Sequence, residues 1–175
     1  VAWTAAVRIQ GESRSTAYPL ALYFLGVVSV GRIGCFLNGC CFGLPTETAF
    51  AFAYPVDTLA HQTHQLAGWI GEDAGQALAV HPVQLYEAAF LVVLSVALVV
   101  IRRWTRDDLA TALCVLAAYL AFRGGVDPLR GMVNTESSLT AVGPLTGFQW
   151  MMCFAAIFAV AAGVWRARRH VSAGP

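Results

Sequence analysis

The sequence predicts an all-α, polytopic membrane protein that forms a single membrane domain over residues 1–175. Its residues are 58% hydrophobic and only 12% charged, with a mean hydropathy of +0.63. Soluble domains carry about twice that charged fraction. Four apolar segments account for the difference, and each approaches the ~20 residues that a helix needs to cross a bilayer: they are 17–36, 83–101, 109–123 and 145–165.

The basic residues predict how these four helices are oriented. All eleven are arginines, and most lie before the first segment, between the second and third, or after the fourth: Arg8, Arg14, Arg102, Arg103, Arg106, Arg166, Arg168 and Arg169. Four spans place these groups on one side, which the positive-inside rule makes cytoplasmic. Both chain ends are therefore expected in the cytoplasm, with loop 44–82 on the outer side.

The remaining arginines, Arg32, Arg123 and Arg130, lie toward the outer side and break this charge bias together. We expect them to converge on one anion site. The alternative is chance placement with side chains that extend to the interface.

The first segment ends in Gly31–Gly43, with the sequence GRIGCFLNGCCFG. An arginine near the centre of a span costs about 2.5–3.5 kcal/mol, so Arg32 indicates a function. Helical spacing places Cys35 and Asn38 on the same face as Arg32. Asn38 and the glycine that follows it are typical of a helix end.

Small residues and cysteines in this stretch lead to two further expectations. Gly31 and Gly34 are expected to let another helix backbone approach closely. The cysteines follow a C-x4-C-C spacing without a paired CxxC or a neighbouring histidine, so no zinc framework and no other metal site is expected.

Loop 44–82 contains two features whose roles the sequence leaves open. Phe50–Pro55 alternates aromatic and small residues, which fits either a paired strand or an interfacial segment. His61 and His64 share a face if the chain is helical there, but we expect them to be solvated loop histidines rather than ligands.

The second segment begins at His81-Pro-Val-Gln-Leu-Tyr-Glu87. Proline suits the first turn of a helix, and Gln84 and Glu87 then point the same way. A carboxylate one turn inside an apolar span is expected to be protonated or paired. We expect Glu87 to pair with an arginine. The alternative is an interfacial residue bonded to a neighbouring helix end.

The third segment ends in Arg123, Asp127 and Arg130, which follow the i, i+4, i+7 stripe of a helix. Pro128 disfavours helical geometry at Asp127 and predicts a kink. Two cations beside one carboxylate leave a net positive charge that can receive an anion. The alternative is a surface ion-pair ladder of little energetic value.

Four segments in this order resemble the prolipoprotein diacylglyceryl transferase family: Gly31–Gly43, His81–Glu87, Arg123–Arg130 and Leu145–Gln149. The resemblance implies transfer of a diacylglyceryl group from phosphatidylglycerol to the thiol of a lipobox cysteine. It also implies a multi-pass protein of the bacterial plasma (inner) membrane, with the site toward the outer face. The four spans are similar to the C-terminal half of that fold, so a divergent or N-terminally truncated member is expected.

The resemblance also implies roles for individual residues. Candidate catalytic residues are Arg32, Arg123, Asp127, Cys40, Glu87 and His81, and candidate substrate-binding residues are Arg32, Asn38, Gln84, Arg130 and Cys35.

Three positions depart from the family pattern. Cys35 replaces a usual asparagine, Cys40 replaces a functional glutamate, and Asp127 replaces a longer glutamate. We expect Cys35 and Cys40 to face the cavity of Arg32 and Cys41 to point away. These cysteines are either nucleophiles or small residues that fill a tight turn.

Two functions follow from these observations. The first is a phospholipid-dependent transferase acting on a thiol, and the second is a non-catalytic phospholipid-binding membrane protein that has lost its acid–base residues. Both take an anionic phospholipid such as phosphatidylglycerol, and the first also takes a prolipoprotein. A net charge of +1 without a basic stripe gives no indication of nucleic-acid binding, and no cofactor is expected.

Overall fold

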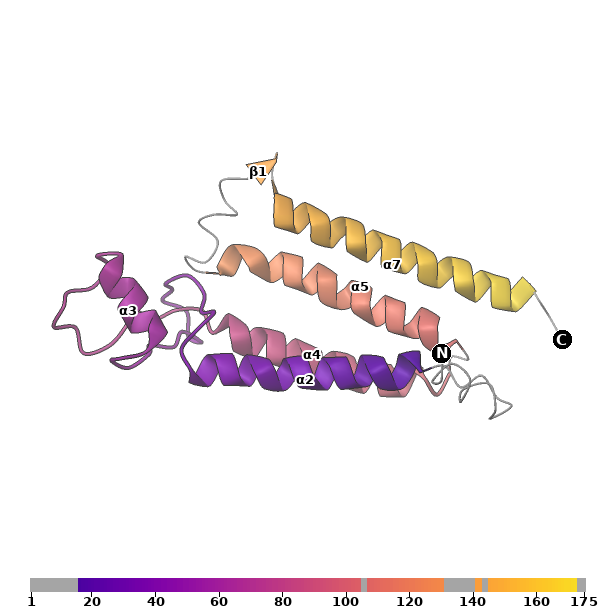
Figure 1. The fold of residues 1–175 in the computed structure, drawn as a ribbon, viewed down its shortest axis with the longest axis horizontal. Helices are drawn as coiled ribbons and strands as arrows, with labels where there is room; N and C mark the ends of the chain where they lie inside the picture. Colours follow the sequence, from indigo (N-terminus) through magenta and orange to yellow (C-terminus); the bar gives the residue numbers. More distant parts are fainter. Residues whose placement is uncertain (1–15, 105–106, 131–140, 143–144, 173–175) are drawn as a thin grey trace, which may run out of the picture.

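The computed structural model describes residues 16–104, 107–130, 141–142 and 145–172. Four long helices lie side by side in it (Figure 1): α2 (Ala17–Leu37), α4 (Val83–Ile101), α5 (Asp108–Val126) and α7 (Gly147–Ser172). Two-residue strands, β1 (Ala141–Val142) and β2 (Leu145–Thr146), pair antiparallel just before α7. The predicted all-α fold class is confirmed.

Three of the described helices are long and apolar enough to cross a membrane, namely α2, α4 and α5 with the turn that continues it to Leu129. The fourth predicted span corresponds to α7, which begins at Gly147 and continues to Ser172. Leu145 and Thr146 belong to β2, and among the residues whose side chains the structure describes, α7 has an apolar stretch over Gln149–Trp165.

Local sequence accounts for both ends of α5. The side chain of Asp107 accepts hydrogen bonds from the backbone N–H groups of Leu109 and Ala110, at 3.1 and 3.0 Å, and so caps the first turn. At the other end Pro128 stops the α-helix, and the chain continues as a 3₁₀ turn, η1 (Asp127–Leu129). Asp127 itself keeps helical torsions, with φ of −53° and ψ of −41°, and the predicted kink stays a prediction.

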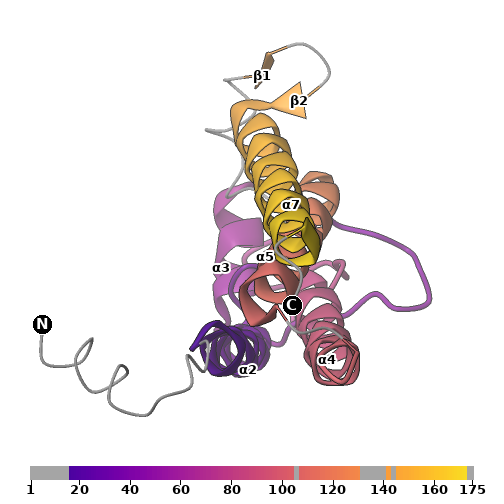
Figure 2. The ribbon, with the colours of Figure 1, turned by 90° about the vertical axis from the view of Figure 1, so that its right-hand side faces the viewer.

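The bundle has a central group of three helices, α2, α4 and α5, with α7 packed along the outer side of α5 (Figure 2). The buried side chains between the three are mainly leucines: Leu25, Leu91, Leu94, Leu98 and Val115. Ser29 donates a hydrogen bond of 3.3 Å to the Ala88 carbonyl and joins α2 to α4.

The glycines that allow close packing are not the predicted ones. A Cβ atom at Gly31 or Gly34 would meet no described atom within 4 Å, so the expected close helix approach there is wrong for the described residues. At Gly163 in α7 a Cβ atom would lie 3.3 Å from the Ala110 carbonyl, which makes this the position where α7 approaches α5 closely.

Loop 44–82 folds into a small unit of its own around helix α3 (Leu59–Leu66). Phe52 pairs with Val80, and Pro55 with Gln76, so the segment is paired from Phe52 onward, whereas Phe50 lies in a turn. A second apolar core forms beneath it from Phe42, Tyr54, Ala60, Ala77 and Val80.

His61 and His64 belong to this core, and the expectation that they are solvated is wrong. Both are buried on α3, at 2% and 0% exposure. The His61 ring lies 2.7 Å from the Ala74 carbonyl, and His64 Nδ1 accepts a hydrogen bond from the Leu78 N–H. Burial, with a contribution from His61, lowers the pKa of His64 below its ordinary value.

The start of α2 and the end of α7 lie at the same end of the bundle, and α3 lies at the opposite end (Figure 1). We call these the turn end, after the α4–α5 turn, and the α3 end. This arrangement agrees with an even number of spans, and the assignment of the turn end to the cytoplasm stays a prediction. Arg8, Arg14 and Arg106 lie outside the described residues.

Candidate functional site

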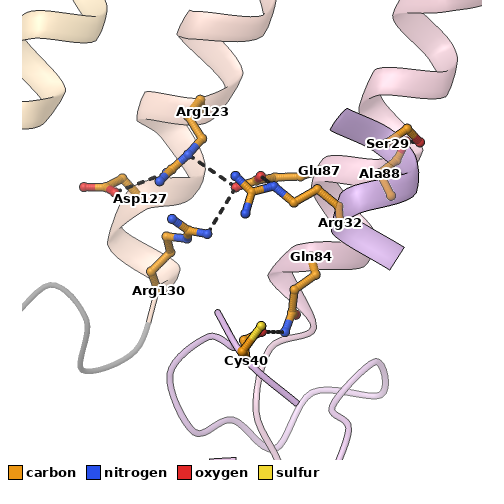
Figure 3. A network of polar contacts seen from close by, with 9 residues as sticks. All are labelled: Ser29, Arg32, Cys40, Gln84, Glu87, Ala88, Arg123, Asp127 and Arg130. Atoms are coloured by element: carbon orange, nitrogen blue, oxygen red, sulfur yellow. Dashed lines mark hydrogen bonds and ion pairs between the residues drawn. The ribbon is translucent and has the colours of Figure 1, made fainter. Parts of the chain in front are cut away.

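A buried carboxylate collects three arginines at the α3 end of the bundle. Glu87 lies one turn inside α4, and its side chain is fully buried. Arg32 Nε of α2 contacts Glu87 Oε2, whereas Arg123 Nε of α5 and Arg130 Nη2 lie 3.4 and 3.8 Å from Oε1. Figure 3 shows the three guanidinium groups directed toward this carboxylate from different segments. The predicted convergence of the arginines is confirmed, and so is the pairing of Glu87.

Asp127 completes what we call the arginine cluster: Arg32, Glu87, Arg123, Asp127 and Arg130. Its Oδ1 lies 3.2 Å from Arg123 Nη1, in the i, i+4 relation predicted from the sequence. Three cations and two carboxylates leave the cluster with a net charge of +1. A surplus positive charge held away from water favours the entry of an anion.

Arg130 is the member of the cluster that is least satisfied. Its Nη2 is buried and makes no hydrogen bond within the part of the chain that the structure describes. Burial lowers the pKa of the Arg130 guanidinium below its ordinary value, and repulsion from Arg123 adds to this. Both Glu87 oxygens are held by ion pairs rather than by hydrogen bonds of good geometry to described residues. An anion at this point would supply the acceptor that Arg130 lacks.

Helix α2, which carries Arg32, ends in a tight reversal of the chain. Gly39 has a φ of +67°, its N–H bonds to the Phe36 carbonyl, and the Cys40 N–H bonds to the Cys35 carbonyl. These are the two hydrogen bonds of a Schellman motif, which ends a helix and reverses the chain over its last turn. Asn38 is exposed at the C-cap of α2.

The reversal leads to a glycine that joins the three segments of the cluster. The Gly43 N–H donates to the His81 carbonyl at 2.9 Å, and the Leu44 N–H donates to the Leu129 carbonyl at 2.8 Å. A Cβ atom at Gly43 would lie 2.6 Å from both of these carbonyl oxygens. Only glycine fits here, between the chain before α4 and the chain after η1.

Gln84 holds this turn against α4. Its Nε2 donates to the Cys40 carbonyl (Figure 3) and, at 3.1 Å, to the Tyr54 hydroxyl. Burial raises the pKa of Tyr54 to about 12, against the opposing effect of this hydrogen bond. Gln84 therefore supports the site through the backbone, which is a different contact from the substrate contact predicted for it.

The contacts that the structure shows for His81 are to residues outside the arginine cluster. Its Nδ1 lies 3.3 Å from the Tyr86 hydroxyl, and its carbonyl accepts from Gly43. His81 is half-buried at the start of α4. A proton-transfer role for it stays a prediction.

The three cysteines of this turn lie together. Their spacing in the sequence did not indicate this. The Sγ atoms of Cys35, Cys40 and Cys41 all lie within 4.8 Å of one another, and each residue is half-buried. The expectation that Cys35 and Cys40 face the cavity of Arg32 while Cys41 points away into packing is wrong for Cys41, because its thiol lies with the other two. Its left-handed backbone, with φ of +58°, turns its side chain back toward them.

An apolar cavity of about 480 Å³ lies between α2 and α5. Its walls include Leu20, Phe24 and Leu116, and Tyr119 is the lining residue nearest in sequence to Arg123, one helical turn away. The Tyr119 side chain also interacts with the Arg32 guanidinium. Sequence reasoning missed Tyr119, although its i−4 spacing from Arg123 indicates that it shares that helix face.

The helices and the buried charges define a multi-pass membrane protein with a cationic site at one end of its bundle. A family model described as prolipoprotein diacylglyceryl transferase matches residues 7–166. The chain therefore belongs to the prolipoprotein diacylglyceryl transferase family, which confirms the resemblance seen in the sequence. Comparison with curated proteins and with solved structures gave no match.

Proposed function

We propose that this protein transfers a diacylglyceryl group from phosphatidylglycerol to a thiol acceptor such as a lipobox cysteine. The family match supports a transferase of this general kind that acts on phospholipid and lipoprotein in a membrane. The observation that carries the proposal is the convergence of Arg32, Arg123 and Arg130 on the buried Glu87. We propose further that this end of the bundle faces the outer side of the bacterial plasma membrane.

The cluster suits a lipid phosphate. Guanidinium groups bind phosphate oxygens through forked, charge-assisted hydrogen bonds. Arg130 Nη2 has no hydrogen-bond acceptor among the described residues and lies 3.8 Å from Glu87, so it can turn to a phosphate oxygen without breaking a hydrogen bond. Glu87 acts as a positioning residue that holds the three cations in place until the phosphate arrives.

The apolar cavity between α2 and α5 suits an acyl chain of the same lipid. Its volume lies within the ~300–1,000 Å³ range of small-molecule pockets. Tyr119 lines the cavity and interacts with Arg32, so the apolar wall continues into the phosphate site. A lipid held this way presents its glycerol backbone beside the cluster.

The reaction follows from this placement. The sulfur of the acceptor thiolate attacks the terminal glycerol carbon, a C–S bond forms, and the C–O bond to phosphate breaks with departure of glycerol phosphate. The arginines stabilise the charge that develops on the leaving phosphate. The acceptor thiol must first lose its proton. Glu87 is held in ion pairs, so His81 is the better candidate for accepting that proton.

The second candidate function is phospholipid binding without turnover. Two observations favour it: Cys40 stands where the family has a functional glutamate, and both carboxylates of the cluster are engaged by arginines. A protein of this kind holds phosphatidylglycerol through the same arginines and releases no product.

One experiment separates the two functions. The full-length protein is reconstituted in vesicles of labelled phosphatidylglycerol with a lipobox peptide, and mass spectrometry follows the thioether product and the bound lipid. We expect product from the wild type and a loss of about 100-fold or more in Arg130→Gln, the scale for removing a donor to developing charge.

The matched control is Arg102→Gln at the turn end, which should leave turnover unchanged. Bound lipid that requires Arg130, without any product, would establish the binding function instead. Binding and turnover that are both indifferent to Arg130 would refute the phosphate site.

A further inference from the structure

We propose that Cys35, Cys40 and Cys41, here called the thiol cluster, bind one soft metal ion of the Cu(I) class. The three residues bring three Sγ atoms within 4.8 Å of one another at the end of α2. Thiolate sulfur is the ligand that selects thiophilic ions such as Cu(I) over hard ions such as Mg²⁺ or Ca²⁺. The inference does not depend on the lipid chemistry proposed above.

The spacing of the sulfur atoms is close to what a bound ion requires. Three sulfurs that surround an ion in a plane at a metal–sulfur distance of ~2.3 Å lie about 4.0 Å apart. The observed separations of up to 4.8 Å differ from this by less than 1 Å. Small rotations of the cysteine side chains are expected to close that difference.

The number of ligands indicates which kind of ion fits. Structural zinc sites are closed by four protein ligands. The described part of the chain places three possible metal ligands together here, and all three are cysteines. Three thiolates without a fourth described ligand favour an ion that accepts low coordination, and Cu(I) is an ion of this kind that soft thiolate ligands select.

The backbone conformation of Cys41 supports a ligand role over simple filling of a turn. Its φ of +58° is a left-handed conformation that residues with a side chain rarely adopt, and glycine would occupy it without strain. Strain of this kind persists where the surrounding structure holds a residue for a purpose. Here the conformation directs the thiol toward Cys35 and Cys40.

The surroundings allow an ion to enter and offset the negative charge of the thiolates. All three cysteines are half-buried, so the sulfurs are neither sealed in the core nor freely solvated. Cys41 lies close enough to Arg32 and Arg130 to interact electrostatically with both guanidinium groups. The charge of a trithiolate complex is therefore placed beside the cationic cluster.

The test is Cu(I) binding by the full-length protein, purified in detergent under reducing, anaerobic conditions and titrated against a chromophoric Cu(I) chelator. We expect one Cu(I) per chain. Removing even an outer-shell partner of a metal site weakens binding by ~10–100-fold, so Cys35→Ser, Cys40→Ser and Cys41→Ser should each lose at least that much. Cys114→Ser and Cys153→Ser, at exposed positions on α5 and α7, are the matched controls and should bind like the wild type.

Cys41→Gly keeps the test decisive if a serine variant misfolds. Glycine relieves the left-handed strain, so this variant should unfold at a temperature no lower than the wild type and still lose Cu(I). Absence of Cu(I) binding by the wild type would overturn the proposal, as would equal binding by the thiol-cluster and control variants. A disulfide between two of the three cysteines in protein isolated from membranes would overturn it in favour of a redox pair.

Discussion

Arginine–carboxylate pairs stand at both ends of the bundle, and the two ends build them differently. At the turn end Arg102 Nε lies 3.2 Å from Asp108 Oδ1, six residues along the chain, and 46% of the Arg102 side chain is exposed. Its guanidinium also lies over the Tyr18 ring, 3.8 Å from the centroid. At the α3 end Glu87 is fully buried and meets arginines from three separate segments.

The difference indicates what each pair is for. Arg102 and Asp108 balance in charge and are local in sequence, and nearly half of the Arg102 side chain is exposed. A pair with an exposed cation of this kind contributes ~0–1 kcal/mol to stability. The arginine cluster forms only when the bundle folds, and its three cations exceed its two carboxylates. Burying surplus charge costs stability unless a ligand offsets it. We infer that the Arg102–Asp108 pair stabilises the α4–α5 turn and contributes to the orientation of the protein in the membrane. The arginine cluster at the α3 end serves to bind an anion.

The largest expected effect is on Glu87. Glu87→Gln removes the carboxylate from three guanidinium groups that are mostly buried, and breaking a buried pair in this way costs ~3–5 kcal/mol. The matched change Asp108→Asn at the turn end should cost no more than ~1 kcal/mol. Equilibrium unfolding in mixed micelles measures both variants. Equal losses of unfolding free energy in the two variants would contradict the inferred difference between the α3 end and the turn end.

The next effect concerns how the α3 end is assembled. Gly43→Ala places a Cβ atom 2.6 Å from the His81 and Leu129 carbonyl oxygens, which are backbone atoms on either side. Overpacking of this kind costs ~1–3 kcal/mol, and we expect phosphatidylglycerol binding to fall with it. Gly31→Ala is the matched control, since its Cβ atom would meet no described atom within 4 Å. If Gly43→Ala unfolds like Gly31→Ala and binds phosphatidylglycerol equally well, the three segments are held together by something other than this turn.

The sequence was sufficient to predict the four apolar segments and the arginine cluster. Hydropathy predicted α2, α4 and α5 closely, because a membrane helix is set by a long local run of apolar residues. The convergence of Arg32, Arg123 and Arg130 could be predicted because each breaks the charge bias at the same end of the bundle. Glu87 followed from the cost of a lone carboxylate in an apolar span.

The features that sequence reasoning missed depend on backbone torsions or on distant contacts. The thiol cluster requires the Schellman turn at Gly39 and the left-handed conformation of Cys41, and a C-x4-C-C spacing does not specify either. The burial of His61 and His64 depends on a small core whose members are spread from Phe42 to Val80. Loop hydropathy gives no measure of such packing.

The smallest expected effect is a pH dependence of stability at the α3 end that the turn end should not share. Burial lowers the folded-state pKa of His64 from its ordinary value of 6.5, so the unfolded chain binds a proton at a pH where the folded chain does not. The stability associated with neutral His64 is therefore present above about pH 6.5 and is lost as the pH falls through the folded pKa, by at most ~1.4 kcal/mol per pH unit. We expect hydrogen-exchange protection factors in residues 59–80 to drop between pH 7.5 and 5.5 while those of the α4–α5 turn stay level. His64→Gln, whose amide oxygen can still accept from the Leu78 N–H, should flatten this dependence. An unchanged pH dependence in that variant would mean that the acid sensitivity of the α3 end lies in another group.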